Sequence, residues 1–574
     1  MADPEDLVII IIVGGGQIAL STAQELCGLP GHHVVVLWRR DPDLARAVEG
    51  AGAVFVAAAR PDSSEGLERA GVRRAITILA LSPDDQLNLH AALLARDANP
   101  RIRIVLRQFN RTLAQKLEQN LANCSVLSLA WHSAATYAAA AIDPACFRGL
   151  QFPQPEGPLT GFATRIAEDC SVGECTVAQA ERVLAARIVA VDDVIDPARD
   201  AVLPDGAELI IYGEIARPEG SAPRRPMPRR RAAFATRLRL QGRRSRRLTR
   251  LNPILARLAV ATLAFLLVGA AYFHSVFGGS WLDAVYFVIT TMTTTGYGDL
   301  TPDRGDPVEV VAAMVLMLAG ITLTGLFIAF GASLLTRVHW VKLQGLRPVY
   351  RRGHIVVCGG GSIGTSVIDL LFGIGKRLVV IEQDPDTSLV ERAREQRFDL
   401  LTGDASRDST LDLCHLDAAH SLIALTNVDT LNLEIALGAR ARNPTMPIVL
   451  RIAEASFAQS IARHFEFDTT YSAAALAAPA LVGLSRHSGS RGRVSFGRRE
   501  FEIAELGIED RAQALPAGAV SIATSRGSDF EIAHDVDYRT LGADDRALVL
   551  IPLAPFREDE GTLVAAKEPA ANLD

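Results

Sequence analysis

Two long apolar segments on either side of the stretch TTMTTTGYGDL constrain this chain more than any other feature. The first, Leu258 to Phe273, extends back to Ile254 if Arg257 reaches the membrane interface. The second, Val310 to Thr336, would measure about 40 Å as a helix, so it should tilt or project beyond the bilayer. We therefore predict two membrane-spanning helices around a polar loop, rather than a pair of buried core helices.

The charges beside the two segments predict how they cross the membrane. Arg224 to Arg250 holds about a dozen arginines, and no acidic residue lies between Gly220 and Leu282. Basic residues also follow the second segment, whereas the loop between the two is acidic. Because basic flanks stay on the cytoplasmic side, we predict a multi-pass protein of the cell membrane with both termini in the cytoplasm. The arginine block is then a topology signal that contacts membrane lipid, and we expect no nucleic-acid binding.

The composition suits a small membrane part joined to several soluble domains. The chain has 574 residues, of which 49% are hydrophobic, and a net charge of −6. Its seven cysteines show no paired spacing, which predicts reduced thiols in a cytosolic compartment and no zinc site. The acidic N-terminus predicts no signal peptide, and Leu7 to Val13 is predicted as a buried strand.

The soluble parts repeat one another. The stretches VIIIIVGGGQIALSTAQELCGLPGHHVVVLWRRDP and HIVVCGGGSIGTSVIDLLFGIGKRLVVIEQDP both read as strand, glycine turn, helix and strand. Both continue with strand and helix patterns that share an Asn-Leu pair, an Asn-Pro turn and a final Val-Leu-Arg. Alternating apolar strands and helices favour a doubly wound parallel sheet, so we predict two Rossmann-like lobes.

A smaller region with short alternating strands around a helix follows each lobe, at Val172–Gly213 and Arg499–Leu553, and is predicted as an α+β lobe. The fold class is therefore mixed: an α-helical two-span module plus two α/β Rossmann-like domains, each with a small C-terminal lobe. The predicted domains are a Rossmann lobe at 1–150, its C-lobe at 151–215, a basic linker at 216–250, the membrane module at 251–340, a second Rossmann lobe at 341–485, and its C-lobe with a tail at 486–574.

The polar stretch between the spans can replace the hydration shell of a metal ion. Backbone carbonyls around a common axis do this for potassium, and such a strand needs left-handed residues, which glycine tolerates. Trp281 to Thr293 is predicted as a short pore helix whose carboxyl end favours a cation at the pore centre. One loop cannot surround an ion, so four copies of the chain are needed. The predicted K⁺ ligands are Thr294, Thr295, Gly296 and Tyr297.

These residues resemble a known family. TTTGYGD (Thr293–Asp299) resembles the selectivity-filter signature of potassium channels, and AGITLTGL (Ala319–Leu326) resembles the inner helix of simple two-helix bacterial potassium channels. The resemblance implies a homotetramer and a gating hinge at Gly320, with Gly325 as the alternative. The filter residues it implies are Thr294, Thr295, Gly296, Tyr297, Gly298 and Asp299.

One position departs from that resemblance. Thr290 stands where some relatives carry a glutamate behind the filter, so the carboxyl pair that those relatives form with Asp299 is absent. Tyr286 lies one pore-helix face away, and we expect its hydroxyl to brace Asp299 instead.

The glycine turn of the second lobe predicts a nucleotide site. GGGSIG has G-x-G-x-x-G spacing between a predicted strand and helix, and Glu382 ends the next strand. A carboxylate there accepts hydrogen bonds from ribose hydroxyls, while phosphates lie at the helix N-terminus. We predict NAD(H) or an adenine nucleotide; the alternative is a retained fold whose glycines only allow tight packing. The predicted ligand-binding residues are Gly359, Gly361, Ser362, Ile363, Gly364 and Glu382.

The first lobe keeps the turn but changes the acid. When the two Asp-Pro pairs at Asp41 and Asp384 are aligned, Arg39 stands opposite Glu382. An arginine cannot accept from a ribose, although with Arg40 it could bind an additional phosphate. The predicted site holds a phosphate-bearing ligand or another anion, or it is unused. Its candidate residues are Gly14, Gly16, Gln17, Arg39 and Arg40.

Paired Rossmann lobes with small C-terminal lobes beside a potassium pore resemble RCK domains (regulators of potassium conductance). Gly403 and Asp404 in TGDAS match the family's Gly-Asp turn and join the predicted ligand-binding residues, whereas AAARPDS in the first lobe has lost that motif. The resemblance implies that four chains supply eight lobes to a ring that pulls on the inner helices when ligand binds. Some relatives bind Ca²⁺ at this turn, but LTNVDTLNLE lacks their glutamate-rich continuation, so Ca²⁺ remains the weaker alternative.

A ligand-gated potassium channel, which is not an enzyme, is the leading function. One alternative is a component of a potassium uptake transporter, but the family's uptake pores use several unlike loops in one chain. The other is a membrane-tethered NAD(P)-dependent oxidoreductase, and neither half shows an acid–base residue beside a substrate lobe.

Overall fold

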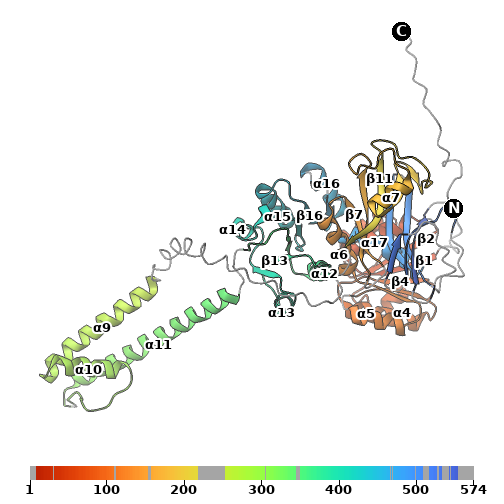
Figure 1. Ribbon diagram of the computed structural model, residues 1–574. Helices are drawn as coiled ribbons and strands as arrows, with labels where there is room; N and C mark the ends of the chain where they lie inside the picture. The colour runs from red at the N-terminus through yellow and green to blue at the C-terminus, as the bar shows by residue number, and fades with distance from the viewer. Residues whose placement is uncertain are drawn as a thin grey trace, which may run out of the picture. The chain divides into compact units, whose positions relative to one another are not determined.

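The computed structural model describes residues 8–553, with gaps at 30, 109–110, 153–156, 217–252, 304, 344–348, 466, 468, 498, 508–515, 527–528, 533–541 and 543–544 (Figure 1). The described residues before 222 and after 346 form one compact unit, and those between form a second. The arginine block and both chain ends lie outside the described residues, as does the helix expected in the second C-lobe.

The two predicted Rossmann lobes are confirmed as parallel six-stranded sheets with the same strand order. Their first strands are continuous apolar runs because helices cover both faces of each sheet. The first sheet has the order β3-β2-β1-β4-β5-β6, with β1 (Val8–Val13), β2 (His32–Trp38), β3 (Val54–Ala57), β4 (Thr77–Ala80), β5 (Arg103–Arg107) and β6 (Cys124–Leu127). Its helices are α1 (Gly16–Cys27), α2 (Pro42–Gly50), α3 (Ser64–Arg69), α4 (Asp85–Ala98) and α5 (Arg111–Asn120).

The second sheet repeats this arrangement after the membrane segments. Its order is β14-β13-β12-β15-β16-β17, with β12 (Ile355–Cys358), β13 (Leu378–Glu382), β14 (Asp399–Thr402), β15 (Ser421–Ala424), β16 (Ile448–Arg451) and β17 (Thr470–Tyr471). Its helices are α12 (Ser362–Gly373), α13 (Thr387–Glu395), α14 (Asp408–Leu411), the short 3₁₀ helix η2 (Leu416–Ala418), α15 (Asp429–Arg442) and α16 (Ala455–Phe465).

The shared Asn-Leu pair marks a buried asparagine with the same role in both lobes. Asn88 accepts from the Ser82 amide at 2.8 Å and donates to the Arg107 carbonyl at 3.0 Å. Asn432 accepts from the Thr426 amide at 2.9 Å and donates to the Arg451 carbonyl at 2.8 Å. Each asparagine satisfies backbone groups where two neighbouring strands end, so this part of the repeat maintains the fold.

Each small lobe is an antiparallel sheet whose first strand precedes the stretch of short strands noted in the sequence. The first comprises β7 (Cys146–Gln151), β8 (Leu159–Ile166), α7 (Val177–Leu184), β9 (Ala186–Val191), β10 (Val194–Ile195) and β11 (Glu208–Ala216). The second comprises β18 (Ser490–Phe496), β19 (Arg499–Leu506), β20 (Val520–Arg526), β21 (Asp529–Ile532) and β22 (Asp545–Pro552). The two lobes share one aromatic core, in which the Phe162 and Phe496 rings lie 5.9 Å apart.

The two regulatory halves exchange a helix within the chain. The helix α6 (Leu129–Ile142), which follows the first sheet, packs on α12 of the second, and α17 (Ala473–Leu484) packs on α1 of the first. Nearly every α6 side chain is buried, because the helix lies between the two halves. The Ser421 hydroxyl of β15 donates to the Ala141 carbonyl at 2.7 Å. The halves therefore form one continuous core.

The second unit contains three helices, and a short one follows the first long one and precedes the second, as the sequence predicted. They are α9 (Pro253–Phe277), α10 (Trp281–Met292) and α11 (Pro307–Leu343), and α10 contacts both of the others (Figure 1). Val260–Phe277 is long and apolar enough to cross a membrane, and only 11% of that window is buried. In α11 the apolar part whose side chains are described is Pro307–Leu323, which is shorter than a membrane span.

Candidate functional site

The short helix α10 presents its carboxyl end to the polar stretch. The Ser280 hydroxyl caps the N-terminus by accepting hydrogen bonds from the Leu282 and Asp283 amides. The Asp283 carboxylate in turn accepts a hydrogen bond from the Ser280 amide. The Phe273 ring of α9 lies 4.7 Å from the Phe287 ring of α10. A fixed start and a packed face hold the helix so that its negative dipole end precedes the polar stretch.

The backbone of the polar stretch alternates in handedness. Thr294, Gly296 and Gly298 have φ of +61°, +50° and +77°, whereas the intervening Thr295 and Tyr297 do not have positive φ. Because a left-handed conformation is costly for threonine, Thr294 is a strained position, and such strain clusters at functional sites.

The stretch is tied back to the last turn of α10. The Thr290 carbonyl accepts hydrogen bonds from the Thr295 amide at 2.8 Å and the Gly296 amide at 3.1 Å. The Thr293 and Thr295 hydroxyls lie 3.0 Å apart. The threonines between the two apolar helices therefore anchor the start of an irregular backbone to the end of α10.

The structure contains the expected contact between Tyr286 and Asp299. The Tyr286 hydroxyl hydrogen-bonds the Asp299 carboxylate. The Tyr286 ring also stacks on the Tyr297 ring, with centroids 6.4 Å apart and planes 3° apart. The Thr290 hydroxyl donates to the Tyr286 carbonyl at 2.8 Å and is not a partner of Asp299.

The two candidate hinge glycines have different surroundings. A Cβ at Gly320 would lie 2.6 Å from the Met292 Cα and 2.7 Å from the Met292 carbonyl oxygen, whereas one at Gly325 would meet nothing within 4 Å. Gly320 therefore allows α11 to approach the end of α10 closely, which is a packing role that the sequence did not reveal. A substitution at Gly320 would displace the helix that carries the polar stretch.

A cavity of about 410 Å³ lies at the carboxyl edge of the second Rossmann sheet and brings the predicted residues of that lobe together. Gly359 has φ of +104°, and a Cβ at Gly364 would lie 2.0 Å from the Gly359 carbonyl oxygen, so both positions require glycine. The cavity is lined by Gly359, Gly361, Ser362, Ile363, Ile381, Glu382, Gln383, Gly403, Asp404, Ala405, Leu425, Thr426, Asn427, Leu431 and Arg451.

Two carboxylates in this cavity hydrogen-bond the surrounding backbone. Glu382 accepts from the Gly360 amide through one oxygen and from the Gln383 amide at 2.9 Å through the other. Hydrogen bonds from the Ser406 hydroxyl and amide, helped by an ion pair to Arg407, hold the pKa of the Asp404 carboxyl below its usual value. The Asp404 carboxyl is therefore an ionised acceptor at neutral pH.

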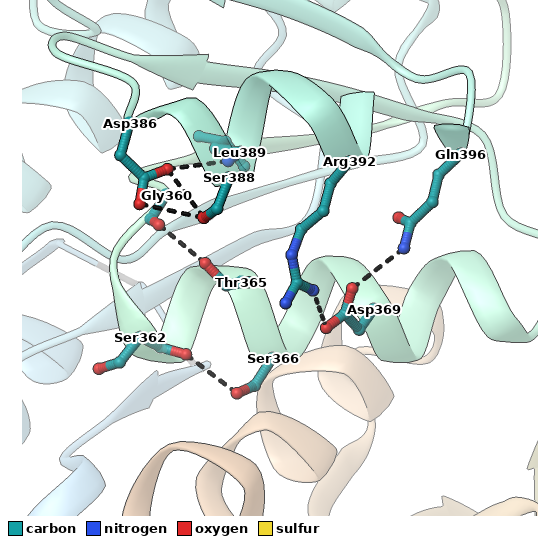
Figure 2. Close-up of polar contacts among 10 residues, drawn as sticks. All are labelled: Gly360, Ser362, Thr365, Ser366, Asp369, Asp386, Ser388, Leu389, Arg392 and Gln396. Carbon is teal, nitrogen blue, oxygen red and sulfur yellow. Dashed lines mark hydrogen bonds and ion pairs between the residues drawn. The ribbon is translucent and has the colours of Figure 1, made fainter. Parts of the chain in front are cut away.

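Helix α13 closes one side of the glycine turn. Figure 2 shows Asp386 capping α13 through the Leu389 amide at 2.8 Å, and the Thr365 hydroxyl donating to the Gly360 carbonyl at 2.8 Å. Arg392 of α13 forms an ion pair with Asp369 of α12 (Figure 2). The turn is thus held between two linked helices with the amino end of α12 beside the cavity.

The Ca²⁺ alternative has no support. Both carboxylate oxygens of Asp429 accept from the Ala453 amide at 3.0 Å. No group of three or more His, Cys, Asp or Glu side chains suited to a metal occurs among the residues described.

The register corrects the predicted alignment of the first lobe. Gly14 donates to the Leu37 carbonyl as Gly359 donates to the Ile381 carbonyl, so Trp38, not Arg39, occupies the position of Glu382. The Asp-Pro alignment concealed one additional residue after the strand.

The Trp38 indole covers the glycine turn of the first lobe. A Cβ at Gly15 would lie 2.2 Å from the Trp38 Nε1, and the Arg39 guanidinium lies 5.9 Å from the Trp38 ring centre. Ala58 and Ala59 stand where the other lobe has its Gly-Asp turn. No group at these positions can accept from a ribose, and the side chain of Arg40 is exposed.

Family models match three parts of the chain. The TrkA-N domain matches residues 10–128 and again 355–472, and the ion channel family matches residues 260–337. The chain carries one TrkA-N (RCK) domain before a two-helix potassium-channel domain and a second one after it. The RCK resemblance and the mixed fold class are thereby confirmed.

Named proteins share parts of this architecture. Potassium channel protein 1 of Methanocaldococcus jannaschii is 26% identical over 34% of this chain and 60% of its own length. The voltage-gated potassium channel Kch of Escherichia coli is 26% identical over 35% of this chain and 50% of its own length. The solved structure of the GsuK channel bound to NAD aligns over 96% of this chain and 78% of its own, at 15% identity and a TM-score of 0.48. The chain covers 32–60% of the length of the first three curated relatives that it matches.

Proposed function

We propose that this chain is one subunit of a potassium-selective channel, not an enzyme, and that a nucleotide bound to its C-terminal RCK domain controls opening. The observation that carries the proposal is the backbone of the polar stretch. Thr294, Gly296 and Gly298 alternate positive φ with residues of negative φ between two apolar helices. Such alternation turns successive carbonyl groups toward the same side, as carbonyl coordination of dehydrated K⁺ requires.

The channel is a homotetramer, because one stretch supplies only a quarter of the coordination shell of K⁺. Exposed apolar side chains on α9 and α11 provide surface for lipid and for neighbouring copies: Val260, Leu263, Leu267, Met314, Leu318 and Ile321. Both termini lie in the cytoplasm, and the eight RCK domains of four chains form a ring. The exposed Leu437, Phe457 and Phe465 on α15 and α16 are suited to contacts between chains in that ring.

The ligand is NAD(H) or an adenine nucleotide without a 2′-phosphate. Glu382 would accept from the ribose hydroxyls and repel a phosphate at the same place, while the amino end of α12 favours the phosphate chain. Trp38 removes the equivalent acceptor from the first lobe, so we propose that only the C-terminal pocket is used.

The match to the TrkA-N domain also favours a second candidate, a component of a potassium uptake transporter. Flux through such a system would depend on a coupled ion or on a separate pore subunit. A channel needs neither, so purified chain alone distinguishes the two.

Flux into liposomes that contain only the purified full-length chain tests the proposal. We expect the vesicles to take up potassium but not sodium down its gradient. Gly298→Ala should abolish the uptake, because alanine at φ of +77° is strained. Gly50→Ala, at an exposed glycine of α2 where an added Cβ would meet nothing within 4 Å, is the matched control. Equal sodium and potassium flux, or no flux without a second protein, would refute the channel.

A further inference from the structure

The segment between α11 and β12 is fastened to one part of the C-terminal Rossmann lobe. We call residues 349–354 the connector, because they lead from the inner helix into the first strand of that lobe. The Val349 amide donates to the Leu413 carbonyl, and the Gly353 amide donates to the Ala418 carbonyl, both at 2.8 Å. Two backbone hydrogen bonds therefore hold the ends of the connector.

Side chains strengthen this attachment. The Arg351 guanidinium forms an ion pair with Asp399, and a His415 ring nitrogen lies 3.2 Å from the Arg351 carbonyl. His354 is fully buried, with a ring nitrogen 2.9 Å from the Cys414 carbonyl. Every partner of the connector named so far lies within residues 399–420, which we call the pocket stretch.

The middle of the pocket stretch forms one wall of the nucleotide cavity. Gly403, Asp404 and Ala405 line the cavity, immediately after β14 ends. The side chain of Ala405 also belongs to the hydrophobic cluster that includes the buried Val349. The pocket stretch thus lines the cavity at Gly403–Ala405. It contacts the connector on either side of that point, through Asp399 of β14 and Ala418 of η2.

The wall makes polar contacts of its own. Asp404 accepts from the Ser406 amide at 3.0 Å and the Ser406 hydroxyl at 2.8 Å, and its other oxygen pairs with Arg407. Arg407 directly precedes α14, and its carbonyl accepts hydrogen bonds from the Thr410 amide at 2.9 Å and the Leu411 amide at 3.2 Å. A ribose hydroxyl that binds the Asp404 oxygen paired with Arg407 would share that oxygen with the guanidinium and so weaken the ion pair.

We propose that the pocket stretch couples occupancy of the C-terminal cavity to the connector, with Asp404 as the ligand-sensing end and the Arg351–Asp399 and Val349–Leu413 contacts as the joint to the inner helix. The inference rests on the proposed function for its consequence, which is channel opening. One part of the inference does not depend on that function. Removing the Asp404 hydrogen bonds should increase the mobility of the connector. Arg351 and Asp399 are positioning residues that touch neither ligand nor K⁺.

Hydrogen exchange of the full-length protein without nucleotide tests the part that does not depend on channel function. Asp404→Ala removes the bonds to Ser406 and Arg407, and we expect the amides of the connector to exchange at least about tenfold faster. Asp386→Ala is the matched control, because it removes a helix cap on the opposite side of the same cavity. Unchanged connector exchange in Asp404→Ala, or an equal change in both variants, would overturn the proposal.

Recording with NAD⁺ and, separately, ADP tests the coupling. In Arg351→Gln we expect the nucleotide effect on potassium current to fall at least about fivefold, with the affinity for nucleotide within about twofold of wild type. The exchanged pair Arg351→Asp with Asp399→Arg should restore the effect. Arg352→Gln, at the exposed neighbouring arginine, should behave as wild type.

The outcomes separate the inference from the proposed function. If wild type conducts no potassium or ignores both nucleotides, the proposed function fails, and the exchange experiment still decides the inference. If wild type responds and Arg351→Gln responds equally, the joint is wrong. If Arg351→Gln loses nucleotide binding itself, the contacts shape the pocket, and the coupling claim is also wrong.

Discussion

The two Rossmann lobes share their internal framework and differ at the edge where a ligand would bind. Asn88 and Asn432 make corresponding buried hydrogen bonds beside corresponding strands. At the binding edge, however, Trp38 replaces Glu382, and two alanines replace the Gly-Asp turn. The buried asparagine occurs in both copies, whereas the carboxylates that we propose for ribose recognition are present in one. The first lobe therefore serves as a structural partner whose exchanged helix completes the core of the second.

The largest expected effect tests whether the framework is equally important in both lobes. Asn432→Ala leaves the Thr426 amide and the Arg451 carbonyl without their buried partner, which should cost about 3 kcal/mol of folding free energy. Asn88→Ala should cost about the same. Chemical denaturation of the purified full-length chain measures both, and the exposed Asn427→Ala serves as control. If only one buried asparagine matters, the lobes do not share a framework.

The next effect concerns the exchanged helices, where buried His132 of α6 corresponds to Leu476 of α17 when their serine caps are aligned. Burial, with the nearby Arg148 and Arg491 charges, lowers the pKa of His132 from 6.5 to about 3. The unfolded chain therefore binds a proton that the folded chain excludes, so stability is complete above pH 6.5 and declines as pH falls toward 3. The loss at pH 5 should be about 2 kcal/mol.

Denaturation at pH 7 and pH 5 measures this difference between the helices. His132→Leu, which copies the other helix, should lose less stability on acidification than wild type. His464→Leu, at an exposed histidine, should leave the pH dependence unchanged. An identical pH dependence in His132→Leu would show that the exchanged helix is not the acid-sensitive element.

The smallest effect sharpens the difference at the binding edge. Glu382→Ala removes the ribose acceptor and should weaken NAD⁺ or ADP binding by about tenfold, which is about 1.4 kcal/mol. Trp38→Ala should leave the affinity within about twofold, because no nucleotide binds the first lobe. Calorimetry on the full-length chain measures both, with Asp384→Ala as the exposed control. A comparable loss in Trp38→Ala would mean that both lobes bind nucleotide.

The sequence predicted features that depend on local pattern. Continuous apolar strands, the glycine turn and the two parallel sheets followed from periodicity and spacing, and the pore helix was placed within one residue of its observed end at Met292. Predictions that required knowing what lies across space were wrong or absent. The alignment of Arg39 with Glu382 failed because equal Asp-Pro pairs concealed an inserted residue. The close approach of Gly320 to Met292 has no signal in the chain.

The helix exchange was missed although a signal was present. Residues 129–142 and 473–484 are both rich in alanine and apolar around their whole circumference. Such a helix must be buried on every side, which a single Rossmann lobe cannot provide at its end.

Planar-bilayer recording of the purified full-length chain, with potassium and sodium on opposite sides and NAD⁺ or ADP added to the face that carries the RCK domains, tests the central claim most directly. We predict a current carried by potassium whose open probability changes with nucleotide, and Glu382→Ala should need about tenfold more nucleotide than wild type for the same change. A current carried equally by sodium, or a nucleotide response that persists undiminished in Glu382→Ala, would contradict the account.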